Sequence, residues 1–190
     1  MERSIVLCIT GASGSIYGYR LVELLKEDFQ IDLIVSSSGR LVMKEELGII
    51  PEDMIERFPY VNLIQDGRID SHVASGSRLV KYSGVVVAPC SMSTLAHVAN
   101  GLNKNLIHRV CETALKERVP LVLLLRETPI SPIHIENMLK ASKAGAIIMP
   151  ASPGFYHRPK SLQDLVDFVV GKVLDSLRID HNLHTRWKNP

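Results

Sequence analysis

The feature that most constrains the fold of this 190-residue chain is an alternation of short apolar runs with amphipathic segments. Five runs rich in β-branched residues predict buried strands at residues 4–10, 31–35, 85–88, 121–126 and 146–149. Helical patterns predict helices at residues 16–25, 40–47, 93–99, 105–118, 132–143 and 161–177. Strands that alternate with helices form βαβ crossovers. The sequence therefore predicts a doubly wound, Rossmann-like α/β fold, in which helices cover both faces of a mostly parallel sheet.

Residues 48–80 are polar and weakly periodic, and they predict no defined element. We expect residues 1–190 to form a single domain with a C-terminal tail from about residue 180. No apolar run approaches the ~18 residues needed to cross a bilayer, and the N-terminus lacks the pattern of a signal peptide. The three cysteines have no C-x-x-C spacing, which argues against a disulfide framework or a zinc site. A cytoplasmic location is expected, and a formal charge of +2 is too small to indicate nucleic-acid binding.

The loop after the first strand contains small residues, from Gly11, Ala12 and Ser13 to Gly14 and Ser15. In doubly wound sheets, ligands bind outside the carboxyl ends of the strands. Glycine lets the backbone approach a phosphate, and the N-terminus of the following helix attracts an anion. The loop is neither a G-x-G-x-x-G fingerprint nor a Walker A loop, because no Lys follows the glycines. It is either a phosphate site or a tight turn with a capping serine.

Two further strand ends carry polar groups. Ser91, Ser93 and Thr94 begin a helix, where their hydroxyls either cap that helix or bind a phosphate or flavin edge. The neighbouring Cys90 is interpreted as a packing residue. Arg126 and Glu127 follow a buried strand, and they form either a structural ion pair or a site where a carboxylate handles protons.

Other charged and aromatic residues lie farther along the chain. Arg109 and Lys116 are expected on one helix face, where Lys116 could also pair with Glu112. Residues 150–159 form a proline-rich loop whose Tyr156 could provide an apolar wall. Lys172 could be a surface lysine or could reach an anion near that loop. A His pair in the C-terminal tail has no supporting ligands, so no metal site is predicted.

Taken together, these motifs resemble the UbiX family of flavin prenyltransferases over residues 9–188. The matching blocks occur in order along the chain, at residues 9–14 with 17–18, 74–77, 88–95, 114–118, 125–129 and 155–159. One block alone would be weak evidence, but six with these spacings are specific.

The resemblance implies that FMN binds between subunits of a homododecamer. It also implies a reaction in which the dimethylallyl group of dimethylallyl phosphate is joined to N5 and C6 of reduced FMN. The product, prenylated FMN, would serve UbiD-type decarboxylases.

By position, the resemblance also implies the site residues. The residues matched to FMN contacts are Gly11, Ala12, Ser13, Ser36, Ser91, Met92, Ser93, Thr94 and Arg126. The residues matched to the substrate and its phosphate are Arg109, Lys116, Arg126, Tyr156 and Lys172. Those matched to catalytic groups, including the groups linked to proton handling, are Ser13, Glu46, Lys116 and Glu127. Tyr156 and Lys172 would serve the site of a neighbouring subunit.

The residue types suit this chemistry, because an allylic phosphate leaves as an anion that Lys116, Arg126 and Lys172 could stabilise. An aromatic face at Tyr156 could shelter a transient allyl cation. The chain has no Asp-rich motif to hold magnesium, which favours a monophosphate substrate. Two positions depart from the family pattern: Lys172 replaces a frequent Arg and loses bidentate geometry, and Ser93 replaces a frequent Lys.

Two alternatives remain open at this point. An FMN-dependent decarboxylase of a peptidyl or pantothenoyl cysteine would need a catalytic His beside the flavin, and residues 91–97 offer only His97. A non-catalytic FMN carrier would have no use for Lys116, Tyr156 and Lys172 beside the flavin.

Overall fold

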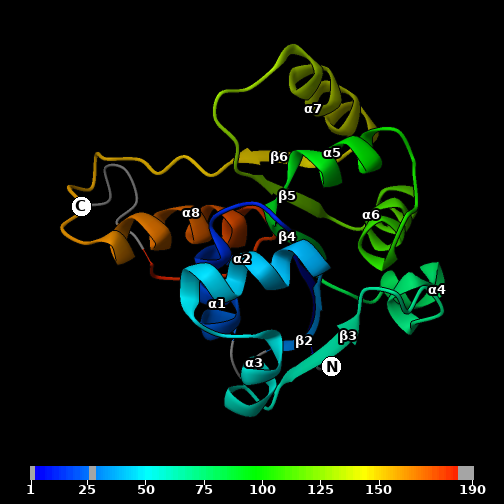
Figure 1. The fold of residues 1–190 in the computed structure, drawn as a ribbon, viewed down its shortest axis with the longest axis horizontal. Helices are drawn as coiled ribbons and strands as arrows, with labels where there is room; N and C mark the ends of the chain where they lie inside the picture. Colours follow the sequence, from blue (N-terminus) through cyan, green and yellow to red (C-terminus); the bar gives the residue numbers. More distant parts are fainter. Residues whose placement is uncertain (1–2, 26–28, 184–190) are drawn as a thin grey trace.

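The computed structural model describes residues 3–25 and 29–183, and a six-stranded parallel sheet runs through its centre (Figure 1). The spatial order of the strands is β3-β2-β1-β4-β5-β6. Their bounds are Arg3–Ile9 for β1, Phe29–Val35 for β2, Val61–Gln65 for β3, Gly84–Cys90 for β4, Leu121–Leu125 for β5 and Ile147–Pro150 for β6. Every adjacent pair is parallel. The predicted doubly wound fold is confirmed, and its strand order reverses between β1 and β4.

Helices cover both faces of the sheet (Figure 1). One face packs against α1 (Ser15–Leu25), α2 (Ser37–Leu47), α3 (Pro51–Arg57) and α8 (Leu162–Ser176). The other face packs against α5 (Met92–Ala99), α6 (Leu106–Glu117) and the short α4 (Gly76–Leu79), while α7 (Pro132–Ala144) packs on α5. The six predicted helices are α1, α2, α5, α6, α7 and α8, each within a few residues of its expected bounds.

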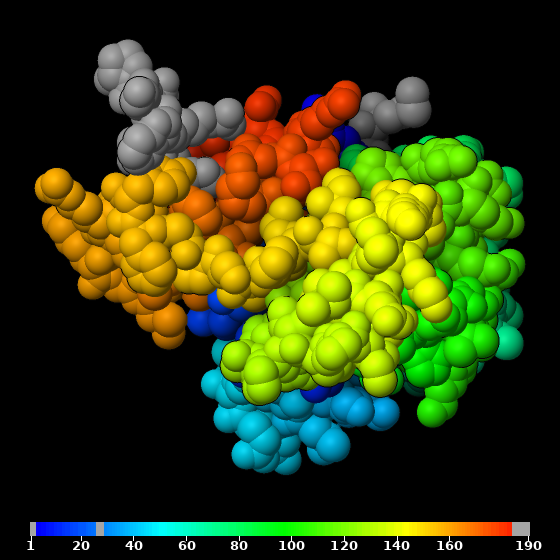
Figure 2. Space-filling view, turned by 90° about the horizontal axis from the view of Figure 1, so that it is seen from above, coloured from blue at the N-terminus to red at the C-terminus, as the bar shows by residue number. Residues whose placement is uncertain are grey.

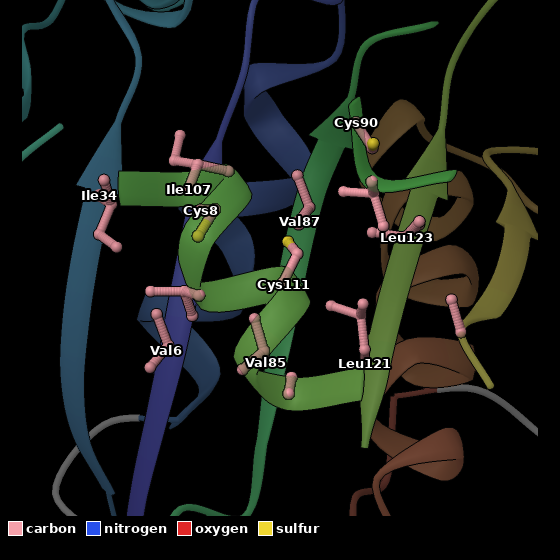
Figure 3. Packing of buried hydrophobic residues seen from close by; sticks show 14 of the residues in the cluster. Val6, Cys8, Ile34, Val85, Val87, Cys90, Ile107, Cys111, Leu121 and Leu123 are labelled. Atoms are coloured by element: carbon pink, nitrogen blue, oxygen red, sulfur yellow. The ribbon is translucent and has the colours of Figure 1, made fainter. Parts of the chain in front are cut away.

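The three cysteines lie in the core between the sheet and α6. Figure 3 shows Cys8 on β1 and Cys111 on α6 in the layer between the sheet and that helix, with Val87 nearby and Cys90 at the upper end of β4. All three thiols are free and fully buried. Burial, followed by the nearby Cys111, raises the pKa of Cys90 well above its ordinary value. This environment confirms that Cys90 is a packing residue, because a thiol that stays protonated is a poor nucleophile.

The segment that predicted no element, residues 48–80, contains α3, β3, a 3₁₀ turn (His72–Ala74) and α4. Its strand β3 lies at the edge of the sheet, where burial alternates and the apolar signal is therefore weak. Polar contacts attach this edge to β2: Asp32 accepts hydrogen bonds from Asn62 Nδ2 at 2.6 Å and from Tyr82 Oη at 2.5 Å. Because these contacts join residues that are distant in sequence, a local sequence pattern cannot predict them.

After β6, an extended stretch leads away from the sheet to the start of α8 (Figure 1). Figure 2, which looks down on α7, places that helix on the outer surface of the molecule. The residues that follow α8 begin by packing against it, because His181 contacts Asp175 Oδ1 through Nε2 at 3.1 Å. The rest of the expected tail, with Trp187 and His184, lies outside the described residues. Within the described ranges, none of the helices combines the length and the apolarity needed to span a membrane.

Candidate active site at the carboxyl edge of the sheet

The loops that follow β1 and β4 are joined at the point where strand order reverses. Thr10, at the end of β1, is buried, and its hydroxyl donates a hydrogen bond to the carbonyl of Pro89 at 2.8 Å. The same hydroxyl accepts a hydrogen bond from the backbone N–H of Ser91 at 2.8 Å. These bonds fix the floor of the crevice in which ligands of doubly wound proteins bind.

The glycine-rich loop after β1 is shaped by Gly11 and occupied by a carboxylate. A Cβ at Gly11 would collide with Ser38 at the start of α2, so the two loops meet closely only because this residue is glycine. The Glu46 carboxylate, from α2, accepts hydrogen bonds from the N–H groups of Gly14 at 2.9 Å and Ser15 at 2.8 Å. The expectation that this helix start offers free N–H groups to a phosphate is therefore wrong for these two residues. The Glu46 carboxylate, which belongs to the same chain, already accepts the hydrogen bonds of the Gly14 and Ser15 N–H groups.

These bonds also set the charge state of Glu46. Burial by itself would raise the pKa of this carboxyl, but hydrogen bonds from the Ser13 side chain and from the Ser15 and Gly14 backbones outweigh it and lower the pKa. Glu46 therefore stays ionised at neutral pH and positions Ser13 and the loop around it.

A cavity of about 390 Å³ opens beside this loop, over the ends of β1 and β4. Hydroxyl groups from the starts of α2 and α5 dominate one side of it, so we call it the hydroxyl cavity. The residues that line it are Thr10, Gly11, Ser36, Ser37, Ser38, Asp66, Ser91, Ser93, Thr94, His97, Lys104, Asn105 and His108.

Two serines of this cavity cap the helices that begin there. The Ser36 hydroxyl accepts a hydrogen bond from Gly39 N at 3.0 Å, and the Ser91 hydroxyl accepts one from Thr94 N at 3.2 Å. The capping interpretation is therefore confirmed for Ser91. Capping and ligand binding are compatible here, because the caps hold the hydroxyls at the mouth of the cavity, next to helix N-termini whose partial positive charge favours an anion.

A second cavity, of about 320 Å³, lies on the other side of the first turn of α5, where β5 and β6 end. We call it the arginine hollow, and its lining comprises Met92, Leu125, Arg126, Glu127, Thr128, Ile130, Met138, Pro150, Ala151 and Ser152. The Arg126 Nε atom is buried and has no hydrogen-bond partner in the described residues. Glu127 is exposed and accepts a hydrogen bond from Thr128 N at 3.0 Å, and no ion pair between Arg126 and Glu127 is present among the described residues.

The two cavities differ in the chemistry of their linings. The hydroxyl cavity offers donors and helix N-termini for a phosphate, whereas the arginine hollow offers apolar walls and a buried guanidinium nitrogen that lacks a partner. A buried donor without an acceptor costs free energy, so a ligand oxygen in this hollow would gain a hydrogen bond from Arg126 Nε. No group of three or more potential metal ligands occurs within residues 3–25 and 29–183.

Most of the residues expected at the flavin are brought together, but four expected at the substrate are not. Arg109, Lys116, Tyr156 and Lys172 line neither cavity. Arg109 pairs with Glu112 at 2.7 Å, so the alternative of a Glu112–Lys116 pair is wrong, and the partner of Lys116 is its neighbour Glu117 at 3.5 Å.

Tyr156 and Lys172 likewise lie outside the linings of both cavities, although Pro150, Ala151 and Ser152 of the 150–159 loop line the arginine hollow. Lys172 pairs with Asp175 at 3.0 Å, and the Tyr156 ring packs against Phe168 with centroids 5.7 Å apart. Lys116 and Lys172 have half of their side-chain surface exposed, and Tyr156 is 45% exposed. Within one chain these groups are therefore accessible, and none of them lines either cavity.

The hydroxyl cavity also contains residues that sequence reasoning missed. Asp66 belongs to the segment that predicted no element, and Lys104 and Asn105 lie between α5 and α6. Asn105 caps α6 by accepting a hydrogen bond from His108 N at 3.0 Å, so a capping pattern at the start of that helix could have placed it near a strand end.

Comparisons with known proteins identify relatives over nearly the whole chain. The family model described as Flavoprotein matches residues 1–174. The flavin prenyltransferase UbiX of Aquifex aeolicus is 54% identical over 187 residues, which cover 98% of this chain and 99% of that protein. The crystal structure of AnUbiX in complex with FMN and dimethylallyl pyrophosphate has a TM-score of 0.93 at 36% identity, with 100% of this chain and 99% of that one covered. A dodecameric FMN-dependent UbiX-like decarboxylase from Escherichia coli O157:H7 has a TM-score of 0.90 at 31% identity, with 98% and 100% covered.

Proposed function

Because the chain belongs to the flavoprotein family and, within it, to the UbiX flavin prenyltransferases, we propose that it joins the dimethylallyl group of dimethylallyl phosphate to N5 and C6 of reduced FMN. The single observation that carries this proposal is the pair of adjacent cavities on either side of the first turn of α5. One suits a phosphate, and the other has apolar walls and an unpartnered guanidinium nitrogen where the reacting ring and the substrate would meet.

FMN is proposed to lie across the first turn of α5, with residues 1–190 forming one flavin-binding domain. Its phosphate end would contact the hydroxyl cavity, and its ring would reach the arginine hollow. The residues assigned to it are Gly11, Ala12, Ser13, Ser36, Ser91, Met92, Ser93, Thr94 and Arg126. The partnering of Ser36 and Ser91 as helix caps supports this assignment, because a rigid hydroxyl loses little entropy on binding.

The substrate phosphate is proposed to bind between subunits, with Arg126 from one chain and with Tyr156 and Lys172 from another. Arg109 and Lys116 would complete its charge balance. The position of Tyr156 and Lys172 outside both cavities of one chain supports this arrangement, as does the dodecameric state of the Escherichia coli relative. Exposed apolar side chains on α7 offer surface for such contacts, namely Ile133, Ile135 and Leu139. We therefore propose a homo-oligomer, specifically a dodecamer.

In the proposed reaction, reduced FMN supplies the nucleophilic nitrogen N5. The chain supplies cations at Lys116, Arg126 and Lys172, which stabilise the phosphate as it leaves. Tyr156 excludes water from the allyl group and places an aromatic face beside its positive charge. Glu127 accepts the proton that leaves C6, and Glu46 holds Ser13 in position beside the flavin. Each of these roles is a proposal for its residue.

The prenylated flavin is proposed to pass to a UbiD-type decarboxylase in the cytoplasm. The decarboxylase alternative is disfavoured by the place of His97, which lines the hydroxyl cavity and binds the Ser93 carbonyl through Nδ1 at 2.8 Å. The carrier alternative predicts a different result in the incubation described next, because a non-catalytic carrier would release FMN unchanged.

The test is mass spectrometry of the flavin after anaerobic incubation of the FMN-loaded, reduced protein with dimethylallyl phosphate. We expect the flavin to gain one five-carbon unit while inorganic phosphate is released. A parallel incubation with dimethylallyl pyrophosphate decides which leaving group is used. Recovery of unmodified FMN in both incubations would contradict the proposed function. Addition of an apo decarboxylase of the UbiD type to the product then tests the transfer.

A further inference from the structure

Two stacked imidazoles form one side of the hydroxyl cavity. His97 belongs to α5 and His108 to α6, and their rings lie almost parallel, with centroids 4.2 Å apart and an interplanar angle of 8°. Both residues line the cavity, yet neither belongs to the set assigned to the flavin or the substrate above. Two adjacent imidazoles cannot both be charged at small cost, so their protonation states must differ when one of them carries a proton.

The hydrogen bonds of the two rings assign their protons. His97 Nδ1 lies 2.8 Å from the carbonyl of Ser93, which can only accept, so Nδ1 carries the hydrogen. His108 Nδ1 accepts a hydrogen bond from Lys104 N at 3.3 Å, so its hydrogen is on Nε2. Burial, then His97 and Lys104, lowers the pKa of His108 to about 4, which keeps this ring neutral at pH 7. His97 Nε2 is therefore the position that can gain a proton without breaking an existing bond.

Two charged side chains, Lys104 and Asp66, line the cavity near the two imidazoles, and they differ in how they are bonded within the chain. The Lys104 ammonium has no ion-pair partner in the described part of the chain. The Asp66 carboxylate faces the same cavity, but it accepts hydrogen bonds from Asn105 Nδ2 at 2.7 Å and from Ile107 N at 3.3 Å. Burial raises the pKa of Asp66. The Asp66 carboxylate is thus hydrogen-bonded to the start of α6, whereas the Lys104 ammonium is available to a ligand.

We propose that Lys104 and His97 bind the phosphate of FMN together, and that His97 takes up one proton from solvent at Nε2 when the phosphate enters. The inference rests on the proposed function, in which FMN is the ligand of this cavity. A phosphate dianion would meet one permanent cation and one imidazole that becomes a cation in its presence, opposite the hydroxyls of Ser36, Ser91 and Ser93. His108 stays neutral, and its Nε2–H is a further donor.

The consequence is that FMN binding consumes protons, whereas riboflavin binding does not, since riboflavin shares the ring but lacks the phosphate. FMN affinity should fall as pH rises from 6.5 to 8.5, because the site must then recover the His97 proton against a lower proton concentration. The phosphate of free FMN is already mostly dianionic at pH 7.5, so its own titration contributes little there.

The experiment is calorimetric titration of the apo protein with FMN at pH 7.5, in two buffers of different ionisation enthalpy. We expect net proton uptake with FMN and none with riboflavin. His97→Gln keeps a hydrogen-bonding side chain that cannot titrate, and it should abolish the uptake. The matched control is His134→Gln on α7, because glutamine at that N3 position can preserve the capping box with Ser131.

Lys104 is tested by the ratio of FMN to riboflavin affinity. Lys104→Gln should reduce this ratio roughly tenfold, as expected for the loss of a charge-assisted contact. The exposed Lys143→Gln on α7 should leave the ratio unchanged. Riboflavin binding shows that each variant is folded. Unchanged proton uptake in His97→Gln, or an unchanged ratio in Lys104→Gln, would overturn the inference alone. Failure of the wild-type protein to bind either flavin would overturn the proposed function and the inference with it.

Discussion

The hydroxyl cavity and the arginine hollow lie on opposite sides of one helical turn, yet they differ in how complete they are. In the hydroxyl cavity, Thr10, Ser36 and Ser91 are held by hydrogen bonds within the chain. In the arginine hollow, the buried Arg126 Nε has no partner in the described residues, and Glu127 is exposed. The proposed phosphate end of the site is therefore built within a single chain, whereas the proposed reacting end contains a buried donor that no other described residue satisfies.

This difference has a physical reason. The hydroxyl cavity is formed by helix starts and strand ends, whose positions are fixed by the core beneath them. The proposed substrate groups lie on segments that the core does not bring together, because α6 packs on one face of the sheet and α8 on the other, while the stretch after β6 extends outward (Figure 1). The comparison predicts that changes in the arginine hollow affect turnover, whereas changes around the hydroxyl cavity affect flavin affinity and stability.

The largest effect is expected at Glu127. Glu127→Gln removes the carboxylate that is proposed to accept the C6 proton, so completion of the fourth ring should slow by on the order of 10²–10⁴-fold. Rapid-mixing absorbance of the anaerobic reaction measures this rate, and flavin titration should give an unchanged FMN affinity. The exposed Glu136→Gln on α7 is the matched control. Product formation at the wild-type rate would mean that Glu127 has no catalytic role.

A smaller loss of turnover is expected at Tyr156. Removing its ring in Tyr156→Ala should reduce turnover roughly 10- to 100-fold by weakening dimethylallyl phosphate binding and the aromatic contact with the allyl group. FMN affinity should stay nearly intact, because the ring packs on Phe168 rather than against the hydroxyl cavity.

Mixing Tyr156→Ala with Lys116→Ala shows whether the site is shared between chains. If it is, mixed assemblies should recover part of the activity, since some sites draw both wild-type residues from different parents. Subunit exchange is verified separately by native mass spectrometry. If subunits exchange and no activity is recovered, the whole site lies within one chain. The proposed difference in completeness between the two cavities would then be wrong.

Glu46 tests the second half of the comparison, because its replacement should affect stability. Glu46→Gln should lower the free energy of unfolding by about 1–2 kcal/mol, because a neutral amide is a weaker acceptor for the Gly14 and Ser15 N–H groups. The lowered pKa of Glu46 means that the wild-type protein keeps this stabilisation above pH 4.5 and loses it as pH falls further. Urea unfolding at pH 7 and pH 4 measures both effects. Glu45→Gln, an exposed neighbour, should behave like the wild type.

The smallest effect is expected at His108. The pKa of His108 is about 4 in the folded protein and near 6.5 in the unfolded chain. Below pH 6.5 the imidazole is therefore mostly protonated in the unfolded chain but neutral in the folded protein. Stability should therefore fall with decreasing pH, by about 1 kcal/mol between pH 7.5 and 6. His108→Asn should remove this part of the slope in urea unfolding of the apo protein. An identical slope in the variant would show that the buried imidazole is not the source.

Particular elements show how far sequence reasoning reached. Strands β1, β2, β4 and β5 were predictable, because each is largely buried and reads as a continuous apolar run. The edge strand β6 is only partly buried, but its sequence is still a short apolar run. The edge strand β3 was missed, because its burial alternates and its polar residues bind distant partners such as Asp32. For the site, the serines at helix starts were predictable from capping chemistry, and Arg126 from its place after a strand.

The sequence by itself determined the layers of the fold, the place of the strand ends and the chemical type of the residues at them. These properties follow from periodicity and capping, which act within a few residues. Only the tertiary structure decided that Glu46 occupies the helix start beside Ser13, that Asp66, Lys104 and His108 meet in the hydroxyl cavity, and that Lys116 and Lys172 stay outside it. Each of these contacts, or its absence, depends on how segments more than thirty residues apart pack on the sheet, and no local pattern encodes that.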